Sequence, residues 1–264
     1  MKDFALKDFI SAMIKNQSAP GAPFVFEHND SLSLHFDLCA IQSQMSFKEP
    51  DRLVLSYTRT MMGFLLLNAS PKRIGMIGLG GGSMPKYCYR HLPDCHVTIA
   101  EINPDVIALR EKFQVPPNNS RFEVLCMDGA AYVHHQSGSL DVLIVDGFEG
   151  SCVPSQLSSQ SFYDDCYECL EDGGVMVANL CREDAKFSAY VERIRKSFEG
   201  AVTIVLSEDC FNRVIFARKG SGLFLNEEAL IERAEKLEMM HDLRFLYIAK
   251  QIIRNKSINL SVVQ

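Results

Sequence analysis

The feature that most constrains this chain is a glycine-rich turn that interrupts a run of apolar residues. Residues 73–77 are mainly apolar, four glycines lie between positions 78 and 82, and a helix-like pattern follows, with Pro85 in its first turn. Because glycine has no Cβ, its backbone adopts positive φ angles and approaches a ligand closely, while the N–H groups of the following helix attract an anion. The segment therefore predicts a strand, a nucleotide-binding turn and a helix.

The residues beyond the turn narrow the kind of nucleotide. Dinucleotide-binding turns have Gly or Ala five positions after the first glycine, and this chain has Ser83 there, which makes a dinucleotide the weaker interpretation. The next apolar segment, residues 96–101, ends in Glu101, at a spacing from the turn where a carboxylate accepts from ribose hydroxyls. The alternative is a solvated glutamate that caps the helix starting near Pro104.

Composition excludes several classes of protein. With 264 residues, 47% of them hydrophobic and 23% charged, the chain can bury a core as one large domain or as one domain with an appendage. No apolar run is long enough to cross a membrane, and the first nine residues have no signal-peptide core, so we expect a cytoplasmic protein without a membrane partner. A net charge of −6 argues against nucleic acid as a partner and is compatible with a small cation.

The nine cysteines show no spacing typical of a complete metal site. Cys166 and Cys169 have the spacing of half a zinc site, but no second pair completes it, and both fall within a predicted helix. We interpret them as ordinary buried or half-buried cysteines and expect no metal.

From residue 73 onward, strand-like segments alternate with helix-like segments, which predicts a parallel sheet covered on both faces. The last two strands are too close in sequence for a crossover and should form an antiparallel hairpin. The fold class is therefore α/β, with a methyltransferase-type doubly wound seven-stranded sheet. The predicted strands are 73–78, 96–101, 122–127, 140–146, 174–180, 201–207 and 212–218, and the predicted helices are 83–92, 104–112, 129–135, 160–170 and 184–198.

A small β unit precedes the glycine turn. Residues 4–15 have helical spacing, residues 24–28 and 32–36 alternate as a hairpin, and a third short strand is expected over 39–45. A helix is predicted for 53–67, and one or two more for 226–254, with the last ten residues loose or extended. We divide the chain into residues 1–60, with the N-terminal helix and β unit, and residues 61–264, the nucleoside-binding domain.

Four successive strands end in residues suited to one pocket. Ligands of doubly wound sheets bind at the carboxyl ends of the strands, and carboxylates there accept from ribose hydroxyls, an adenine amine or an ammonium group. The pattern predicts a site for a nucleoside with a cationic appendage. For Asp128 the alternative, an N-cap of the helix at 129–135, is equally favoured. The strand-end residues are Gly78, Gly80 and Gly82, then Glu101, then Asp128 and Gly129, then Asp146.

The loop at residues 146–154 has two carboxylates three positions apart and is typical of a lid or substrate clamp. With this loop the chain resembles the spermidine synthase family, the polyamine aminopropyltransferases, and most closely their bacterial spermidine synthase-like members. The resemblance covers roughly residues 24–218. Its motifs are Ile41-Gln-Ser, the segment from Pro50 to Tyr57, the glycine turn, Glu101-Ile-Asn-Pro-Asp, Cys126-Met-Asp-Gly, the loop itself and the segment from Leu170 to Val175.

The resemblance implies a role for each site residue. Gly78, Gly80 and Gly82 are expected to carry the nucleoside thioether, Glu101 the ribose, and Asp128 with Gly129 the adenine. Asp146 is implied as the amine-facing aspartate, Tyr57 as the substrate-facing tyrosine and Gln42 as a pocket glutamine. The resemblance also implies a homodimer built partly from the N-terminal region, where an isolated hairpin is marginally stable.

Three positions depart from the family's pattern. Gly81 stands where the family's turn usually has an aspartate that receives the donor's ammonium group, Glu149 stands for the second loop aspartate, and Thr58 for the His or Gln after the tyrosine. The nucleoside half of the site is thus kept and the amine half is altered.

Three functional hypotheses remain. The first is transfer of an aminopropyl group from decarboxylated S-adenosylmethionine to a small-molecule amine, releasing methylthioadenosine, with Asp146 accepting the amine's proton and Glu149 holding a distal ammonium. The second is methyl transfer from S-adenosylmethionine itself. The third is a non-catalytic nucleoside-binding protein.

Overall fold

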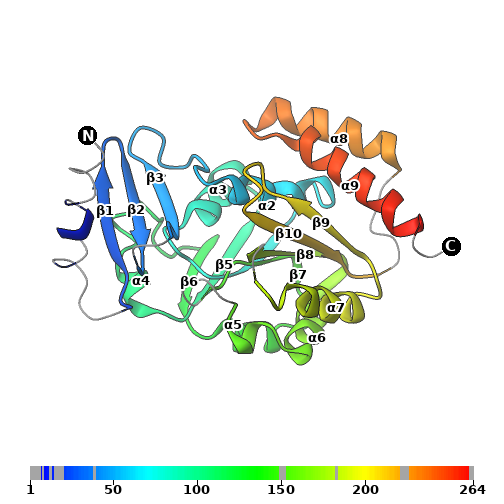
Figure 1. Ribbon diagram of the computed structural model, residues 1–264, viewed down its shortest axis with the longest axis horizontal. Coiled ribbons are helices and arrows are strands. Elements are labelled where there is room, and N and C mark those ends of the chain that lie inside the picture. Colours follow the sequence, from blue (N-terminus) through cyan, green and yellow to red (C-terminus); the bar gives the residue numbers. More distant parts are fainter. Residues whose placement is uncertain are drawn as a thin grey trace.

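The computed structural model describes residues 7, 9–11, 14, 21–37, 40–148, 153–181, 184–220 and 226–261, and for 256–261 it describes the backbone alone. Within these ranges, seven strands form a central sheet and three form a small antiparallel sheet beside it (Figure 1). The predicted fold class is confirmed. The helix expected at residues 4–15 lies largely outside the described residues.

The central sheet has the order β6-β5-β4-β7-β8-β10-β9, parallel from β6 to β8, with β10 antiparallel to both β8 and β9. The hairpin predicted for the last two strands is confirmed. β8 begins four residues earlier than predicted, because Leu170 pairs with Leu140 ahead of a register shift. The strands are β4 (Arg73–Ile77), β5 (His96–Glu101), β6 (Phe122–Cys126), β7 (Leu140–Val145), β8 (Leu170–Cys181), β9 (Val202–Leu206) and β10 (Asn212–Arg218).

The strand order reverses between β4 and β7, and this switch point is where doubly wound sheets bind ligands. Backbone hydrogen bonds continue past the strand ends there. The N–H of Asp146 donates to Ile77 O at 3.0 Å, and the N–H of Gly78 donates to Ala100 O at 2.9 Å. The main chains that leave β4 and β7 are therefore held side by side at the mouth of the sheet.

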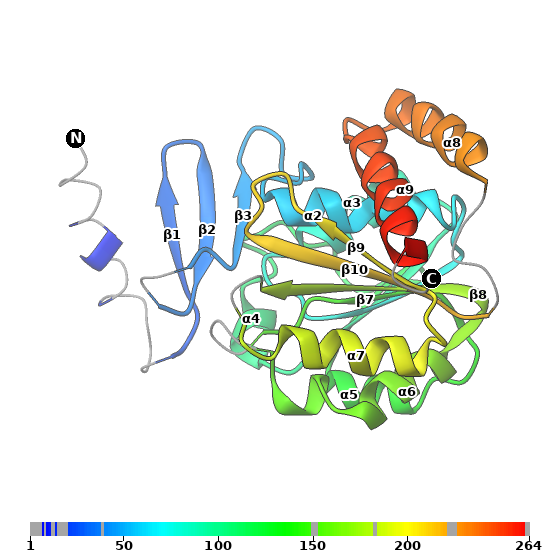
Figure 2. The ribbon, with the colours of Figure 1, turned by 45° about the vertical axis from the view of Figure 1, so that its right-hand side comes forward.

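Helices cover both faces of the central sheet. α5, α6 and α7 lie on one face, and α2, α3, α8 and α9 lie on the other (Figure 2). Each face has its own buried cluster, with Phe162 and Ile194 in one and Phe64 and Phe245 in the other, and burying one such side chain stabilises the fold by about 1.5–3 kcal/mol. The helices are α2 (Ser56–Met61), α3 (Ser83–His91), α4 (Pro104–Ala108), α5 (Gly129–His134), α6 (Gln160–Cys169), α7 (Phe187–Ser197), α8 (Glu227–Met240) and α9 (Phe245–Ser261), with 3₁₀ turns η1 (Met62–Leu66) and η2 (Ser155–Leu157).

Three helical predictions need correction. The helix expected over 53–67 is shorter and changes from α2 to the 3₁₀ turn η1 at Met62. α4 ends at Ala108 instead of residue 112. The last residues were expected to be loose, but α9 continues to Ser261, helped by a 2.5 Å bond from Asn255 Nδ2 to the carbonyl of Ile204 in β9. Cys166 and Cys169 are buried in α6, as interpreted from the sequence.

The N-terminal sheet consists of β1 (Phe24–His28), β2 (Ser31–His35) and β3 (Ser43–Ser46). The predicted hairpin is confirmed, with Asn29 at φ 51° in its two-residue turn, a backbone region that asparagine tolerates. β3 starts at Ser43 instead of residue 39, and Ser43 Oγ lies 3.3 Å from Ser83 Oγ at the start of α3. The small sheet is thereby placed against the glycine turn.

The division of the chain at residue 60 stays a prediction, and its boundary falls inside α2. In the part of the chain that the structure describes, every helix is too short or too polar to cross a membrane.

We predict that Gly78→Ala destabilises the fold much more than Gly200→Ala. Both glycines have positive φ, 91° and 80°, so both alanines would be strained by about 1–2 kcal/mol. A Cβ at Gly200 meets nothing within 4 Å, whereas a Cβ at Gly78 overlaps the main-chain carbonyl of Asp146. We expect Gly78→Ala to lower the free energy of unfolding by about a further 1–3 kcal/mol in urea titrations. Equal losses in the two variants would contradict the close approach of the two main chains.

Candidate active site

A cavity of about 680 Å³ opens at the carboxyl ends of β4 to β7. It is lined from the glycine turn, the ends of β5, β6 and β7, the helix α2 and the N-terminal sheet. Of the predicted site residues, Gln42, Tyr57, Gly78, Gly80, Glu101, Asp128, Gly129 and Asp146 line this cavity. Gly82 is not among the lining residues, and Glu149 lies outside the described residues.

The glycine turn is built for close packing. Gly82 is the N-cap of α3 at φ 68°, without a side-chain cap, and a Cβ there would overlap Val115. A Cβ on Gly81 would lie 2.7 Å from both Phe113 Cδ1 and Ser43 Oγ. The place where the family's turn has an aspartate therefore has no room for a side chain in this chain.

Glu101 holds the glycine turn in place. Its side chain is 8% exposed, and its two oxygens accept the N–H groups of Leu79 and Asn103, each at 2.8 Å. The cap of α4 is Asn103, whose side chain accepts from Asp105 N at 2.9 Å, so the alternative of a solvated, capping Glu101 is wrong. Each carboxylate oxygen keeps a lone pair with which to accept from a ligand hydroxyl.

Asp128 does serve as the N-cap of α5, because its Oδ1 accepts from Ala130 N at 2.7 Å. Asp128 is also one of the residues that line the cavity, and the cap fixes the orientation of its carboxylate there. The next residue is Gly129, where a Cβ would overlap Ile77 at the end of β4. The start of α5 thus packs directly against the strand that precedes the glycine turn.

Asp146, at the end of β7, is held from two sides. The hydroxyl of Tyr57 on α2 donates to its Oδ2 at 3.3 Å, and Asn179 Nδ2 on β8 donates to its Oδ1 at 2.9 Å. Burial raises the pKa of Asp146 to about 6, although the hydrogen bonds from Asn179 and Tyr57 oppose the rise. Burial and the charge of Asp146 raise the pKa of Tyr57 well above its usual value, so Tyr57 is a neutral donor near pH 7.

The sequence patterns did not indicate Asn179 as a site residue. Its one signal in the sequence is that it is the single amide within the apolar run of β8, and in the structure it is 5% exposed. Buried amides are costly unless they are hydrogen-bonded, so such a residue marks a polar partner on a neighbouring element.

The remaining predicted positions come from the N-terminal half. Gln42 lines the cavity, and its backbone is fixed by a 2.9 Å bond from its N–H to Leu34 O. The hydroxyl of Thr58 donates to Leu55 O at 2.6 Å within α2.

The charge of the cavity wall has one sign. Among the described residues that line it, four are carboxylates and none is Lys, Arg or His; the four are Asp37, Glu101, Asp128 and Asp146. Such a wall favours a cationic ligand and disfavours an anionic one.

Residues 54–212 match the profile of the spermine/spermidine synthase domain. The polyamine aminopropyltransferase of Chromobacterium violaceum is 40% identical, over 84% of this chain and 85% of that protein. A solved spermidine synthase in complex with the transition-state analogue AdoDATO has a TM-score of 0.70 at 20% identity, covering 90% of this chain and 83% of that one. Human methyltransferase-like protein 13 in complex with SAH has a TM-score of 0.64 at 23% identity, covering 70% and 92%. At these identities the two structures show the fold alone, whereas the profile and the sequence relative confirm the resemblance.

We predict that Asp146→Asn stabilises the fold at pH 8 and has little effect at pH 4. The folded-state pKa, about 6, lies above the usual value, so the protonated carboxyl is favoured in the folded protein and this stability is lost as the pH rises through 6. An amide removes the buried charge and should raise the free energy of unfolding at pH 8 by about 2 kcal/mol. Urea titrations at both pH values measure this, with the exposed Asp172→Asn as control. A loss of stability at both pH values would instead make Asp146 a structural cap of its loop.

Proposed function

Because the chain belongs to the spermine/spermidine synthase family, we propose that it transfers an aminopropyl group from decarboxylated S-adenosylmethionine to a small-molecule amine and releases methylthioadenosine. The observation that carries this proposal is the carboxylate of Asp146, which lies in an acidic cavity beside the glycine turn and has a pKa of about 6. That value leaves it mostly ionised at neutral pH and still able to accept a proton.

The nucleoside half of the donor is proposed to bind along the strand ends. Gly78 and Gly80 let the main chain approach the thioether, and Gly82, behind them, lets the chain enter α3. Glu101 accepts from the ribose hydroxyls, and Asp128, next to Gly129, accepts from the adenine amine. The two backbone bonds to Glu101 support this role, because they orient its free lone pairs before any ligand binds.

The amine half is proposed to centre on Asp146. A free alkylamine has a pKa of about 10.4, taking lysine as the model, so near pH 7 it is almost entirely the cation. Asp146 would bind this cation and accept its proton. The nitrogen lone pair then forms a bond to the aminopropyl carbon while the carbon–sulfur bond breaks, and its electron pair goes to the sulfonium, which becomes a neutral thioether. Alignment of the two reactants supplies much of the rate enhancement.

Tyr57 and Gln42 complete the proposed site. Tyr57 donates to Asp146 and is proposed to face the amine, and Gln42, directly before β3, also lines the cavity. We assign the distal ammonium of the amine to Glu149.

We also propose a homodimer built partly from the N-terminal sheet, in which β1 is an edge strand among the described residues. An unpaired edge offers free backbone donors and acceptors to another strand. Light scattering on the full chain that gives the mass of one protomer would refute this arrangement.

For the reaction itself we predict that Asp146→Asn lowers kcat by about 10²–10⁴, because a general base is typically worth that factor. Methylthioadenosine should bind with an unchanged Kd in calorimetry, since its contacts lie elsewhere. Diaminoalkanes of three to five carbons are suitable acceptors, and Asp172→Asn is the matched control. A near-normal kcat in Asp146→Asn would remove Asp146 from the mechanism and make Glu149 the next residue to test.

A second prediction concerns the donor. The α-carboxylate of S-adenosylmethionine would face four carboxylates and no basic side chain among the described lining residues, at a cost on the order of 1 kcal/mol or more. We expect calorimetry to show that the decarboxylated donor binds at least about fivefold more tightly. Equal or tighter binding of S-adenosylmethionine would favour methyl transfer. Binding of either donor without turnover of any amine would favour a nucleoside-binding protein.

A further inference from the structure

The amide that holds Asp146 is itself held from a neighbouring strand. Asn179 Oδ1 accepts from Asn212 Nδ2 at 2.9 Å. Asn179 lies opposite Val214 in the β8–β10 ladder, so Asn212, two residues from Val214, is its diagonal neighbour on the same face. The main-chain ladder already joins these strands, so the bond between the amides is not needed to pair them.

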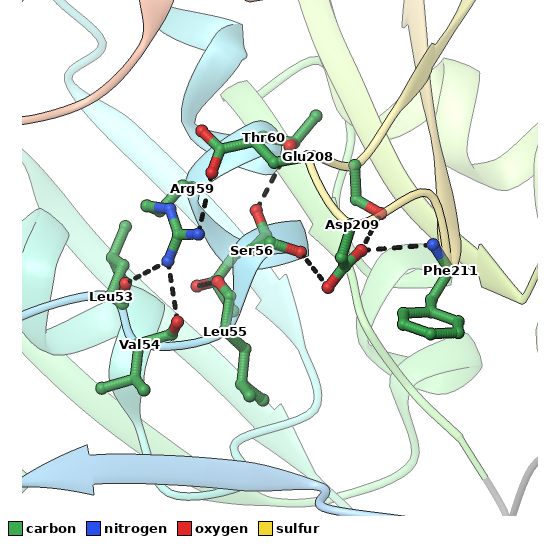
Figure 3. Close-up of polar contacts among 11 residues, drawn as sticks. Leu53, Val54, Leu55, Ser56, Arg59, Thr60, Glu208, Asp209 and Phe211 are labelled. Carbon is green, nitrogen blue, oxygen red and sulfur yellow. Dashed lines mark hydrogen bonds and ion pairs between the residues drawn. The ribbon is translucent and has the colours of Figure 1, made fainter.

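The hydrogen-bonded chain continues into the turn between β9 and β10. The N–H of Asn212 donates to Ser207 Oγ at 3.0 Å, and the hydroxyl of Ser207, fully buried, donates to Asp209 Oδ1 at 2.6 Å. The other oxygen of Asp209 accepts from Ser56 Oγ (Figure 3). Ser56 precedes Tyr57 in α2, so the chain of bonds returns to the helix that holds the opposite side of Asp146.

The direction of each bond follows from the two carboxylates at the ends. An ionised carboxylate only accepts, so Asn179 must turn its NH₂ to Asp146 and its carbonyl oxygen to Asn212. Asn212 therefore donates both ways, through its side chain to Asn179 and through its backbone to Ser207. Side-chain amides do not relay protons, so this chain of hydrogen bonds cannot deliver a proton to Asp146. Its effect is to position the carboxylate.

The turn is also clamped to the start of α2. Arg59 and Glu208 form a 2.9 Å ion pair, and Arg59 Nη1 donates to Leu53 O and Val54 O at 2.9 and 2.7 Å (Figure 3). Partial burial raises the pKa of Asp209, but hydrogen bonds from Ser207, Ser56 and the N–H of Phe211 outweigh it and hold the pKa below its usual value. Asp209 therefore stays ionised over the range in which Asp146 titrates.

We propose that Asn179 and Asn212 are positioning residues for the carboxylate of Asp146, and that the β9–β10 turn, through Asp209 and Ser56, sets Tyr57 against the same carboxylate. This inference rests on the proposed role of Asp146 as proton acceptor. One bond to each oxygen prevents the carboxylate from rotating beside the cavity that Asp146 lines.

The test removes one amide at a time by isosteric substitution. In Asn179→Leu, Asp146 loses a hydrogen bond to its charged form, so the acidic limb of kcat/KM against pH should move from about 6 to higher pH by about one unit. Asn212→Leu leaves Asn179 free to turn and should shift the limb in the same direction by less. Methylthioadenosine should bind to both variants with an unchanged Kd.

Thr203→Val is the matched control. Thr203 is 2% exposed on β9, and its hydroxyl has no hydrogen-bond partner among the described residues, so this variant also replaces a buried polar side chain with an apolar one of similar shape. Its pH profile should equal the parent's. The other titratable groups that line the cavity, Tyr57, Asp37, Glu101 and Asp128, are unchanged in all three variants.

A carbon-13 NMR titration of the Asp146 carboxyl separates this inference from the proposed function, since it needs no turnover. A titration midpoint that rises in Asn179→Leu and Asn212→Leu but not in Thr203→Val supports the positioning role. This result would hold even if the parent protein transfers no aminopropyl group, and then only the proposed function would fail. Unchanged midpoints in both Asn variants would overturn the positioning role. If Asn179→Leu does not fold, the comparison of Asn212→Leu with Thr203→Val tests the same role, because Asn212 is only half-buried.

Discussion

The half-buried carboxylate of Asp146 accepts hydrogen bonds from an aromatic hydroxyl and an amide, and the arrangement of the cavity depends on this interaction. Asp146 ends β7, Tyr57 belongs to α2 and Asn179 to β8, so three elements far apart in sequence must meet for the two bonds to form. Leaving a charge unpaired in such a place costs several kcal/mol, so the positions of Tyr57 and Asn179 relative to Asp146 are under a strong geometric constraint.

The position of the glycine turn also depends on Asp146. Gly78 approaches the main chain of Asp146 so closely that no side chain fits between them, and Glu101 then satisfies the N–H of Leu79 within the turn. The glycine turn and the carboxylate of Asp146 are thus parts of one closely packed junction between β4, β5 and β7. In doubly wound sheets this junction lies at the point where the strand order reverses.

Much of this arrangement follows from local patterns in the sequence. Alternation of apolar segments predicts the seven strands and the terminal hairpin, and the residues at the strand ends predict which side chains reach the cavity. The patterns fail where a distant contact decides the structure. The early start of β8 needs the pairing of Leu170 with Leu140, and the length of α9 is supported by the bond from Asn255 to β9. Asn179 and Asn212 were not predicted because their partners are set by strand pairing, which sequence spacing alone does not show.

The crowded environment of Gly81 limits which side chains this position can accept. A Cβ at this position meets the ring of Phe113, which is fully buried, and the hydroxyl of Ser43. A single substitution of Gly81 by aspartate would therefore clash with the ring and the hydroxyl, so an acidic side chain fits in this turn only if Phe113 and Ser43 also move or change. Substitutions at these three positions should therefore be strongly non-additive, and position 81 is accessible to a larger residue only together with its two neighbours.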